Sequence, residues 1–186
     1  PNIHLAFAAK DGPRAQIINF ANARKEQAGI VYCGTRAKTE TLAKALTESR
    51  HSACHYHGGM DADDRRNVER RFQQEDGLIV CATIAFGMGI DKPDIRWVAH
   101  ADLPKSIESY YQEIGRAGRD GAPAETLTLY GPDDIRLRRT QLDEGMPPPE
   151  RPPAEHARLT ALPRLAQPRA ARRQQLPSSS REVAAP

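Results

Sequence analysis

Leu78-Ile79-Val80-Cys81-Ala82 is a short apolar run with no polar alternation. Such a run is typical of a strand buried on both faces, as in parallel sheets. Further strands are expected at 3–7, 30–33, 52–57, 95–101 and 126–130, and helices between them at 13–27, 36–49, 61–75, 106–115 and 133–142. This alternation predicts an α/β fold with a mostly parallel sheet between helices, in which function gathers beyond the carboxyl ends of the strands.

The composition changes near Gly145. Most of the 15 prolines lie from Pro147 onward, among Arg, Ala and Ser with few large apolar residues. Proline interrupts helices, and segments that bury little apolar surface stay disordered. We therefore expect a globular domain over 1–145 and a poorly ordered Pro/Arg/Ala-rich tail over 146–186.

Composition also limits the class of protein. The chain is 39% hydrophobic and 27% charged, typical of a soluble globular protein, and no apolar run reaches the roughly 20 residues of a membrane span. A formal charge of +3 permits contact with nucleic acid without requiring it. Three cysteines suggest no disulfide framework, which favours an intracellular compartment.

The segment with the clearest chemistry is 112–121, Gln-Glu-Ile-Gly-Arg-Ala-Gly-Arg-Asp-Gly. On a continuing helix, Gln112, Arg116 and Arg119 would share one face. Two guanidinium groups on one edge can clamp a phosphate and stabilise charge that develops during phosphoryl transfer. A solvated basic helix end capped by Gly121 explains the spacing equally well.

A second segment, 82–93, follows the strand at 78–82 directly. Gly87 and Gly89 would let the loop bend tightly and expose backbone N–H groups to a phosphate, and Thr83 could add a hydroxyl. Asp91 could accept from a ribose hydroxyl or hold an arginine. An ordinary connecting loop is the alternative. The sequence contains no Gly-x-x-x-x-Gly-Lys-Ser/Thr, so it has no P-loop of its own.

A third segment follows the strand expected at 30–33. Gly34 and Thr35 open the helix expected at 36–49, whose start could receive a phosphate, although a simple Thr35 N-cap is the commoner explanation.

The run 51–57, His-Ser-Ala-Cys-His-Tyr-His, suggests a metal site. However, only His55 and His57 would share a strand face, opposite Cys54 and Tyr56, and no second ligand pair has zinc-finger spacing. We therefore predict no metal site, and core packing for the three cysteines.

Taken together, these segments resemble the RecQ family of superfamily 2 helicases over about 1–144. The resemblance rests on 32–37, 56–60, 82–93 and 109–121, in that order. The Gly-Arg-x-Gly-Arg pattern occurs in many superfamily 2 helicases, including RNA helicases. Phe86 to Ile90 and Tyr110 to Glu113 point to RecQ in particular.

The resemblance implies a RecA-like three-layer domain that faces an upstream RecA-like domain across a cleft for ATP and Mg²⁺. The upstream domain would supply the P-loop and hold most of both ligands, so this chain alone should not turn over ATP. Arg119, the expected arginine finger, and Arg116 would be catalytic. The expected nucleotide-binding residues are Asp91, Gly89, Gln112, Arg116 and Arg119. The expected nucleic-acid-binding residues are Thr83, Gly34, Thr35, Gly58 and Gly59.

The activity implied is ATP-driven 3′ to 5′ translocation on single-stranded DNA and unwinding of partly duplex DNA, in repair and recombination. The implied location is the cytoplasm, at the bacterial nucleoid, without membrane contact. A non-catalytic nucleic-acid-binding remnant and an RNA helicase domain of the same superfamily are the alternatives.

The tail departs from the family. RecQ proteins commonly continue into a zinc platform with four cysteines, the first just before an Arg-Arg pair. Here Ala171 precedes Arg172-Arg173, and no cysteine follows Cys81. Without thiolates that zinc site cannot form, so the tail is interpreted as its remnant and no zinc is expected.

Overall fold

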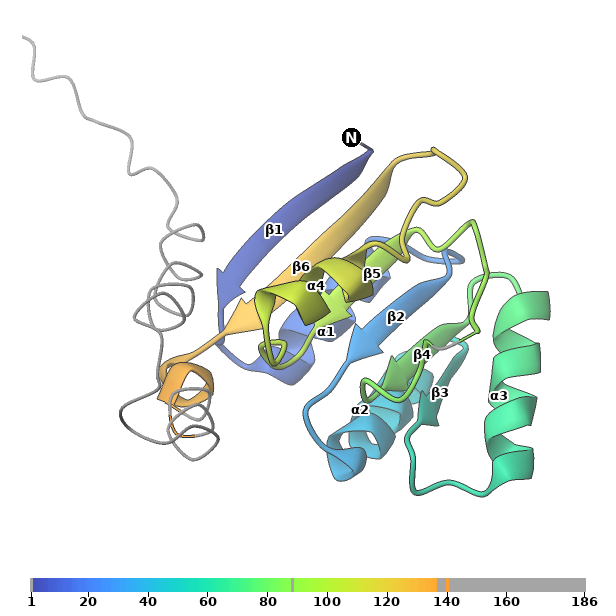
Figure 1. Cartoon of the computed structure of the whole chain (residues 1–186), viewed down its shortest axis with the longest axis horizontal. Helices are drawn as coiled ribbons and strands as arrows, with labels where there is room; N and C mark the ends of the chain where they lie inside the picture. Colours follow the sequence, from blue (N-terminus) through green and yellow to red (C-terminus); the bar gives the residue numbers. More distant parts are fainter. Residues whose placement is uncertain (1, 88, 137–139, 141–186) are drawn as a thin grey trace, which may run out of the picture.

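A computed structural model describes residues 2–87, 89–136 and 140. Its centre is a six-stranded sheet in the order β1-β6-β5-β2-β4-β3, in which all neighbouring strands are parallel (Figure 1). The strands are β1 (Ile3–Ala9), β2 (Gly29–Tyr32), β3 (Ala53–Tyr56), β4 (Ile79–Ala82), β5 (Trp97–His100) and β6 (Ala124–Tyr130). The predicted α/β fold is confirmed, and the sheet is wholly rather than mostly parallel.

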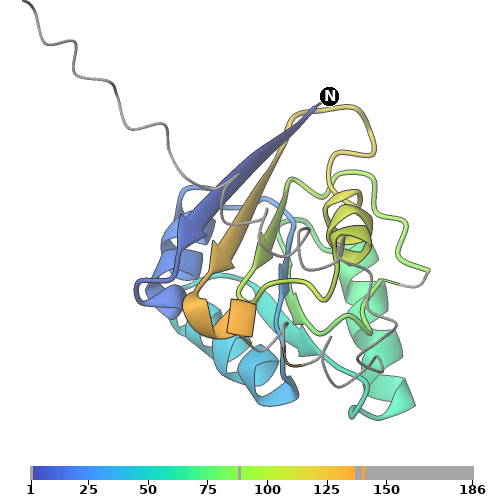
Figure 2. The ribbon, with the colours of Figure 1, turned by 60° about the vertical axis from the view of Figure 1, so that its left-hand side comes forward.

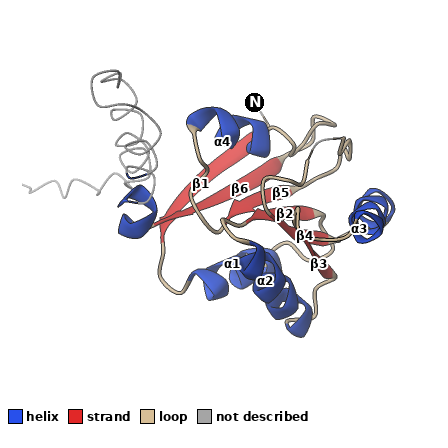
Figure 3. Ribbon diagram, turned by 60° about the horizontal axis from the view of Figure 1, so that its bottom comes forward, coloured by secondary structure: helices blue, strands red, loops and turns tan. Residues whose placement is uncertain are grey.

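Helices cover both faces of the sheet. They are α1 (Pro13–Asn22), α2 (Arg36–Glu48), α3 (Ala62–Gln74) and α4 (Ile107–Ile114). Helices α1 and α2 lie on one side, while α3 and α4 lie on the other (Figures 2 and 3). This is the three-layer arrangement that strand–helix alternation requires.

Each face of the sheet has its own apolar core. On the α1 and α2 side, Ile17, Leu42 and Leu46 pack with alternate residues of β2, β4 and β5. On the other side, Val68 and Phe72 of α3 pack with the remaining strand residues. Strands β2, β4 and β5 are buried along their whole length, which explains why their sequences are uniformly apolar.

Gly29 is required by close packing at the start of β2. A Cβ there would lie 2.1 Å from the ring of Trp97, which is fully buried. The indole N–H donates to the carbonyl of Gln27 at 3.3 Å, and Phe20 contacts the ring edge-on. The indole therefore fills the space that any larger residue at 29 would need.

The expected elements are present with shifts at their ends. Helix α1 ends at Asn22, earlier than expected, and is followed by turns that include Glu26 at φ 62°. β1 and β6 are longer than expected because they pair along seven residues. Of the helix expected at 133–142, residues 132–136 and 140 are helical. The 145/146 boundary and the tail lie outside the described residues, and no described helix is long and apolar enough to cross a membrane.

Candidate nucleotide and nucleic-acid interfaces

The loops of interest meet at one edge because the strands are parallel and in register. Tyr32, the last residue of β2, pairs with Ala82 of β4 on one side and His100 of β5 on the other. The ladder continues for one residue beyond the strands, since the N–H groups of Cys33 and Thr83 donate to Ala82 and Tyr56 carbonyls at 2.8 and 3.1 Å. The loops after β2, β3, β4 and β5 therefore emerge side by side.

These loops surround a pocket of about 710 Å³. Its lining includes four of the five residues expected to bind nucleic acid: Gly34, Thr35, Gly58 and Thr83. Gly59, the fifth, follows Gly58 and lies beneath the Arg36 guanidinium, so that a Cβ there would be 2.7 Å from Arg36 Nη1. The structure thus brings together residues from three separate loops.

Positive side chains enlarge the set of phosphate-binding candidates in this pocket. Arg36, Lys38 and Lys105 line it and are all exposed. Sequence spacing did not single them out as a set, because Arg36 and Lys38 lie at the start of α2 and Lys105 lies in the loop after β5, and they become neighbours only through the sheet. Cationic side chains beside backbone N–H groups at strand ends form a surface suited to a phosphate chain.

Asp102, just beyond β5, fixes the shape of the pocket. Its carboxylate accepts from the Gly34 N–H at 2.8 Å, from Lys38 Nζ at 2.6 Å and from Lys10 Nζ at 2.9 Å. Lys10 also bonds Asp134 at 2.8 Å. Burial would raise the pKa of Asp102, but the bonds from Lys38, Gly34 and Lys10 outweigh it and hold that pKa below its ordinary value.

This arrangement changes what the start of α2 can offer. The Gly34 N–H is already satisfied by Asp102, so it is not a free donor for a phosphate in this state. Thr35 is the N-cap, with its hydroxyl accepting from the Lys38 N–H at 3.3 Å. The expected cap is confirmed, and the expected phosphate contact at Gly34 would require Asp102 to move.

The arginine segment differs from the expected helical face. Helix α4 ends at Ile114 with Gly115 as its C-cap, and residues 115–120 form turns. Gly118 has φ 60°, and its N–H donates to the Ile95 carbonyl at 2.9 Å rather than continuing the helix. The expectation that Gln112, Arg116 and Arg119 share one helix face is therefore wrong, because α4 ends at Ile114 and both arginines lie in the turns that follow it.

Arg116 is held against the loop after β4. Its Nη1 donates to the Gly87 carbonyl at 2.6 Å. Gly87 has φ 139°, and a Cβ there would lie 2.3 Å from Arg116 Nη2. The Nε atom of Arg116 is buried and has no hydrogen-bond partner among the described residues. This contact joins 82–93 to 112–121, the two segments with the clearest chemistry.

Arg119 is loosely held by comparison. Its Nη1 lies 3.4 Å from Asp91 Oδ1, with side chains 42% and 87% exposed, and its Nε bonds the Gly115 carbonyl at 3.3 Å. The expectation that Asp91 holds an arginine thus agrees with the geometry. Gln112, on the last turn of α4, and Gly89, in the loop after β4, are exposed.

Two residues that the sequence analysis missed connect the pocket to the turns at 115–120, which carry Arg116 and Arg119 and are called the arginine turn below. His100 and Glu113 are buried and bonded at 2.8 Å, and His100 also contacts the Thr128 hydroxyl at 3.3 Å. Glu113 lines the pocket and lies three residues before Arg116. The available signal was the position of Glu113, which is three residues after Tyr110 and next to Ile114 and therefore shares the buried face of α4.

Burial also keeps Tyr32 and the three cysteine thiols protonated by raising their pKa values. It raises the pKa of Tyr32 to about 12, against the opposing charge of Arg116. It raises the pKa of Cys33 to about 12 and that of Cys54 to about 11, and it raises that of Cys81 as well. The thiols therefore stay protonated at neutral pH, as expected for core residues.

Residues 13–121 match the family described as helicase conserved C-terminal domain. The chain is 44% identical to "ATP-dependent DNA helicase RecQ" of Haemophilus influenzae over 173 residues, which is 93% of this chain and 28% of that protein. It is 42% identical to the protein of the same name from Bacillus subtilis, covering 69% of this chain and 22% of that protein. The chain thus spans under a third of these relatives.

Solved structures with the same fold include two DEAD-box proteins. A chain of the E. coli DEAD-box protein SrmB, solved with regulator of ribonuclease activity A, aligns with a TM-score of 0.64 and 25% identity, over 79% of this chain and 88% of that one. Domain 2 of the DEAD-box helicase Mss116p, bound to an RNA duplex, aligns with a TM-score of 0.61 and 17% identity, over 77% of this chain and 59% of that one. The second likeness concerns the fold alone.

Proposed function

Because the chain belongs to the family of helicase conserved C-terminal domains, in its RecQ form, we propose that it is the second motor domain of an ATP-dependent DNA helicase. It would couple ATP hydrolysis on an upstream P-loop domain to 3′ to 5′ movement along single-stranded DNA and to unwinding of partly duplex DNA. The observation that carries the proposal is the joining of 82–93 to 112–121 through Arg116 and Gly87, beside a pocket with basic lining.

The arginine turn suits an anionic nucleotide. Arg116 has a buried nitrogen without a partner among the described residues, and Arg119 has only long contacts that a phosphate can replace. When bound, ATP and Mg²⁺ would supply the transferable phosphoryl group and a counter-charge, both held mainly by the upstream domain. Arg119 would stabilise charge on the phosphates, Arg116 would orient them, and Asp91, Gly89 and Gln112 would border the nucleotide.

The pocket suits one strand of nucleic acid. Thr83, Thr35, Gly58 and Gly59 would contact phosphates through hydroxyl and backbone groups, with Arg36, Lys38 and Lys105 as charged partners. Gly34 would join them once Asp102 releases its N–H. Contacts of this kind position a strand without reading its sequence, which a translocating motor requires.

The domain would occupy 1–145, and 146–186 would be the remnant of a zinc platform without its cysteines. An alignment of 173 residues with the H. influenzae protein necessarily includes part of 146–186, which supports the descent of that tail from a RecQ protein. A motor of this kind would act in repair and recombination, at the nucleoid in the cytoplasm.

The nucleic acid is proposed to be DNA because the sequence relatives quoted above are named DNA helicases. An RNA helicase domain of the same superfamily is the alternative. A motor in which this chain is joined to a P-loop domain should unwind a DNA duplex with a 3′ single-stranded extension faster than the matching RNA duplex. Faster unwinding of the RNA duplex would assign the alternative.

A further inference from the structure

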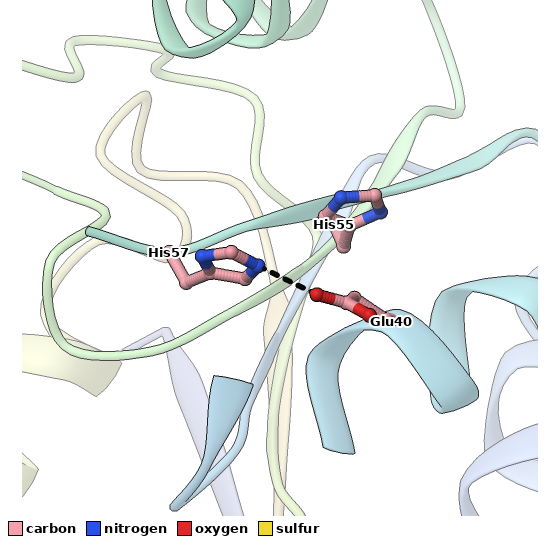
Figure 4. Close-up of side chains that lie close together, drawn as sticks. All are labelled: Glu40, His55 and His57. Carbon is pink, nitrogen blue, oxygen red and sulfur yellow. Dashed lines mark hydrogen bonds and ion pairs between the residues drawn. The ribbon is translucent and has the colours of Figure 1, made fainter. Parts of the chain in front are cut away.

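Glu40, His55 and His57 form a side-chain cluster that the proposed motor function does not use. Glu40 lies on α2, His55 on β3, and His57 directly after β3 (Figure 4). One potential ligand atom from each residue lies within 4.8 Å of the other two. His57 Nε2 and Glu40 Oε1 are 2.9 Å apart, and the two imidazole rings stack with centroids 5.6 Å apart.

The fold explains how these groups meet. Cys54 and Tyr56 pack into the core on the α3 side, so His55 and His57 face the α2 side, as strand alternation predicts. β3 is an edge strand, which leaves this face partly open to solvent. Helix α2 packs across it and supplies Glu40, a third donor that local spacing could not reveal. His51 and Cys54, the other members of the histidine-rich run, do not belong to the cluster.

We propose that Glu40, His55 and His57 bind one zinc ion, which revises the expectation that this chain holds no metal. Two imidazole nitrogens and one carboxylate oxygen are a ligand set that zinc uses, and imidazole donors favour zinc over magnesium or calcium. Three protein ligands on a partly exposed face leave the fourth tetrahedral position to water. Bound zinc would fix the end of β3 to α2.

The distances are close to those that zinc needs. With tetrahedral bonds of about 2.1 Å, two ligands of one ion lie about 3.4 Å apart. The 4.8 Å limit of the cluster is wider, so zinc binding requires the ligands to approach one another, and Glu40 and His55 are not buried, so their side chains can rotate inward. The Glu40 side chain is 55% exposed, whereas that of His57 is 9% exposed and fixed by packing.

Zinc binding must change the proton on His57. The Gly59 N–H donates to His57 Nδ1 at 3.2 Å, so a neutral ring carries its proton on Nε2 and donates it to Glu40. Zinc takes the Nε2 position, the ring proton moves to Nδ1, and the Gly59 N–H loses its acceptor. The turn at Gly58 and Gly59, beside the basic pocket, must therefore shift when zinc binds.

The test uses the full chain without a histidine tag, titrated with zinc against a chromophoric zinc chelator. One zinc per chain is expected, and Glu40→Gln and His55→Ala should each weaken binding at least about tenfold. His51→Ala and Cys54→Ser are matched controls that should change affinity less than twofold. His51 bonds Asn22 at 2.9 Å, and Cys54 faces the other side of the strand.

Two outcomes would overturn the proposal. One is no stoichiometric binding by the wild-type chain, and the other is unchanged affinity in Glu40→Gln and His55→Ala. Circular dichroism of both variants, neither of which alters a buried residue, establishes that they are folded. As an independent readout, zinc should move the Gly59 amide resonance in the wild type and leave it in place in His55→Ala.

Discussion

The basic pocket and the arginine turn lie at the same edge of the sheet, but they are held in different ways. The pocket is organised by Asp102, a half-buried carboxylate with three short bonds to Gly34, Lys38 and Lys10. The arginine turn ends in Arg119, which has one exposed ion pair at 3.4 Å and one long backbone contact. The difference is between a surface held by short bonds and an exposed cation with only long contacts. In the proposed motor, the first would receive the nucleic-acid strand and the second the nucleotide held by the other domain.

The largest effect should come from Arg119→Ala in a motor that joins this chain to a P-loop domain. DNA-stimulated ATP turnover should fall about 10³- to 10⁵-fold, because a cation that stabilises the transferring phosphates is lost. ATP binding and DNA affinity should change little. Arg66→Ala on α3, which removes a similar exposed arginine, is the control. Undiminished turnover in Arg119→Ala would remove this residue from its proposed role.

Asp102→Asn tests whether the pocket depends on its carboxylate. The substitution removes a charged acceptor from three donors, so the free energy of unfolding at neutral pH should fall by about 1.5 to 3 kcal/mol. Because the folded-state pKa of Asp102 lies below its ordinary 3.8, its contribution is fully present above that pH and is lost as the pH falls through the folded value.

Urea denaturation of the two proteins at several pH values measures this effect. The difference in free energy of unfolding between wild type and Asp102→Asn should be constant near neutrality and should decrease below about pH 4. A difference that stays the same at lower pH would mean that the charge of the Asp102 carboxylate does not stabilise the pocket.

A smaller effect is expected for Lys105→Ala, which removes one exposed cation from the pocket lining. Affinity for single-stranded DNA should fall severalfold, and the slope of log K against log salt should decrease by about 0.7, the contribution of one phosphate contact. Lys44→Ala, an exposed residue on α2 outside the pocket lining, should leave both quantities unchanged. Fluorescence anisotropy at four salt concentrations provides the slope, and equal slopes for Lys105→Ala and wild type would place the strand elsewhere.

The smallest effect is expected for Asp91→Asn. The pair with Arg119 is exposed, so the free energy of unfolding should change by less than about 1 kcal/mol. Together with Asp102→Asn, this variant measures the difference between the two regions directly. A loss as large as that of Asp102→Asn would show that the arginine turn is preformed as well.

The order of strands and helices was predictable because apolar runs and capping residues are local signals. Thr35 and Ser106 cap α2 and α4 through their side chains, at the positions where the sequence suggested that helices begin. The end of α4 near Gly115 was predictable as well. The turn that follows it was not, since the Gly118 N–H bonds the carbonyl of Ile95, which is far away in the sequence.

The candidate sites were predictable only where a motif is continuous in sequence. Thr83, Gly58 and the two arginines stood within such motifs. Asp102 and Glu40 did not, because each acquires its role from partners on other strands and helices. Register in the sheet creates these contacts, and periodicity in one segment does not contain that information.

The central claim is that this chain supplies arginines to a nucleotide held by another domain. It is tested most directly by measuring ATP hydrolysis by the full chain, with and without single-stranded DNA. The account predicts no turnover in either condition, and turnover once a P-loop domain is joined to the chain. DNA-stimulated hydrolysis by this chain alone would contradict it, because a complete ATP site would then lie within these 186 residues.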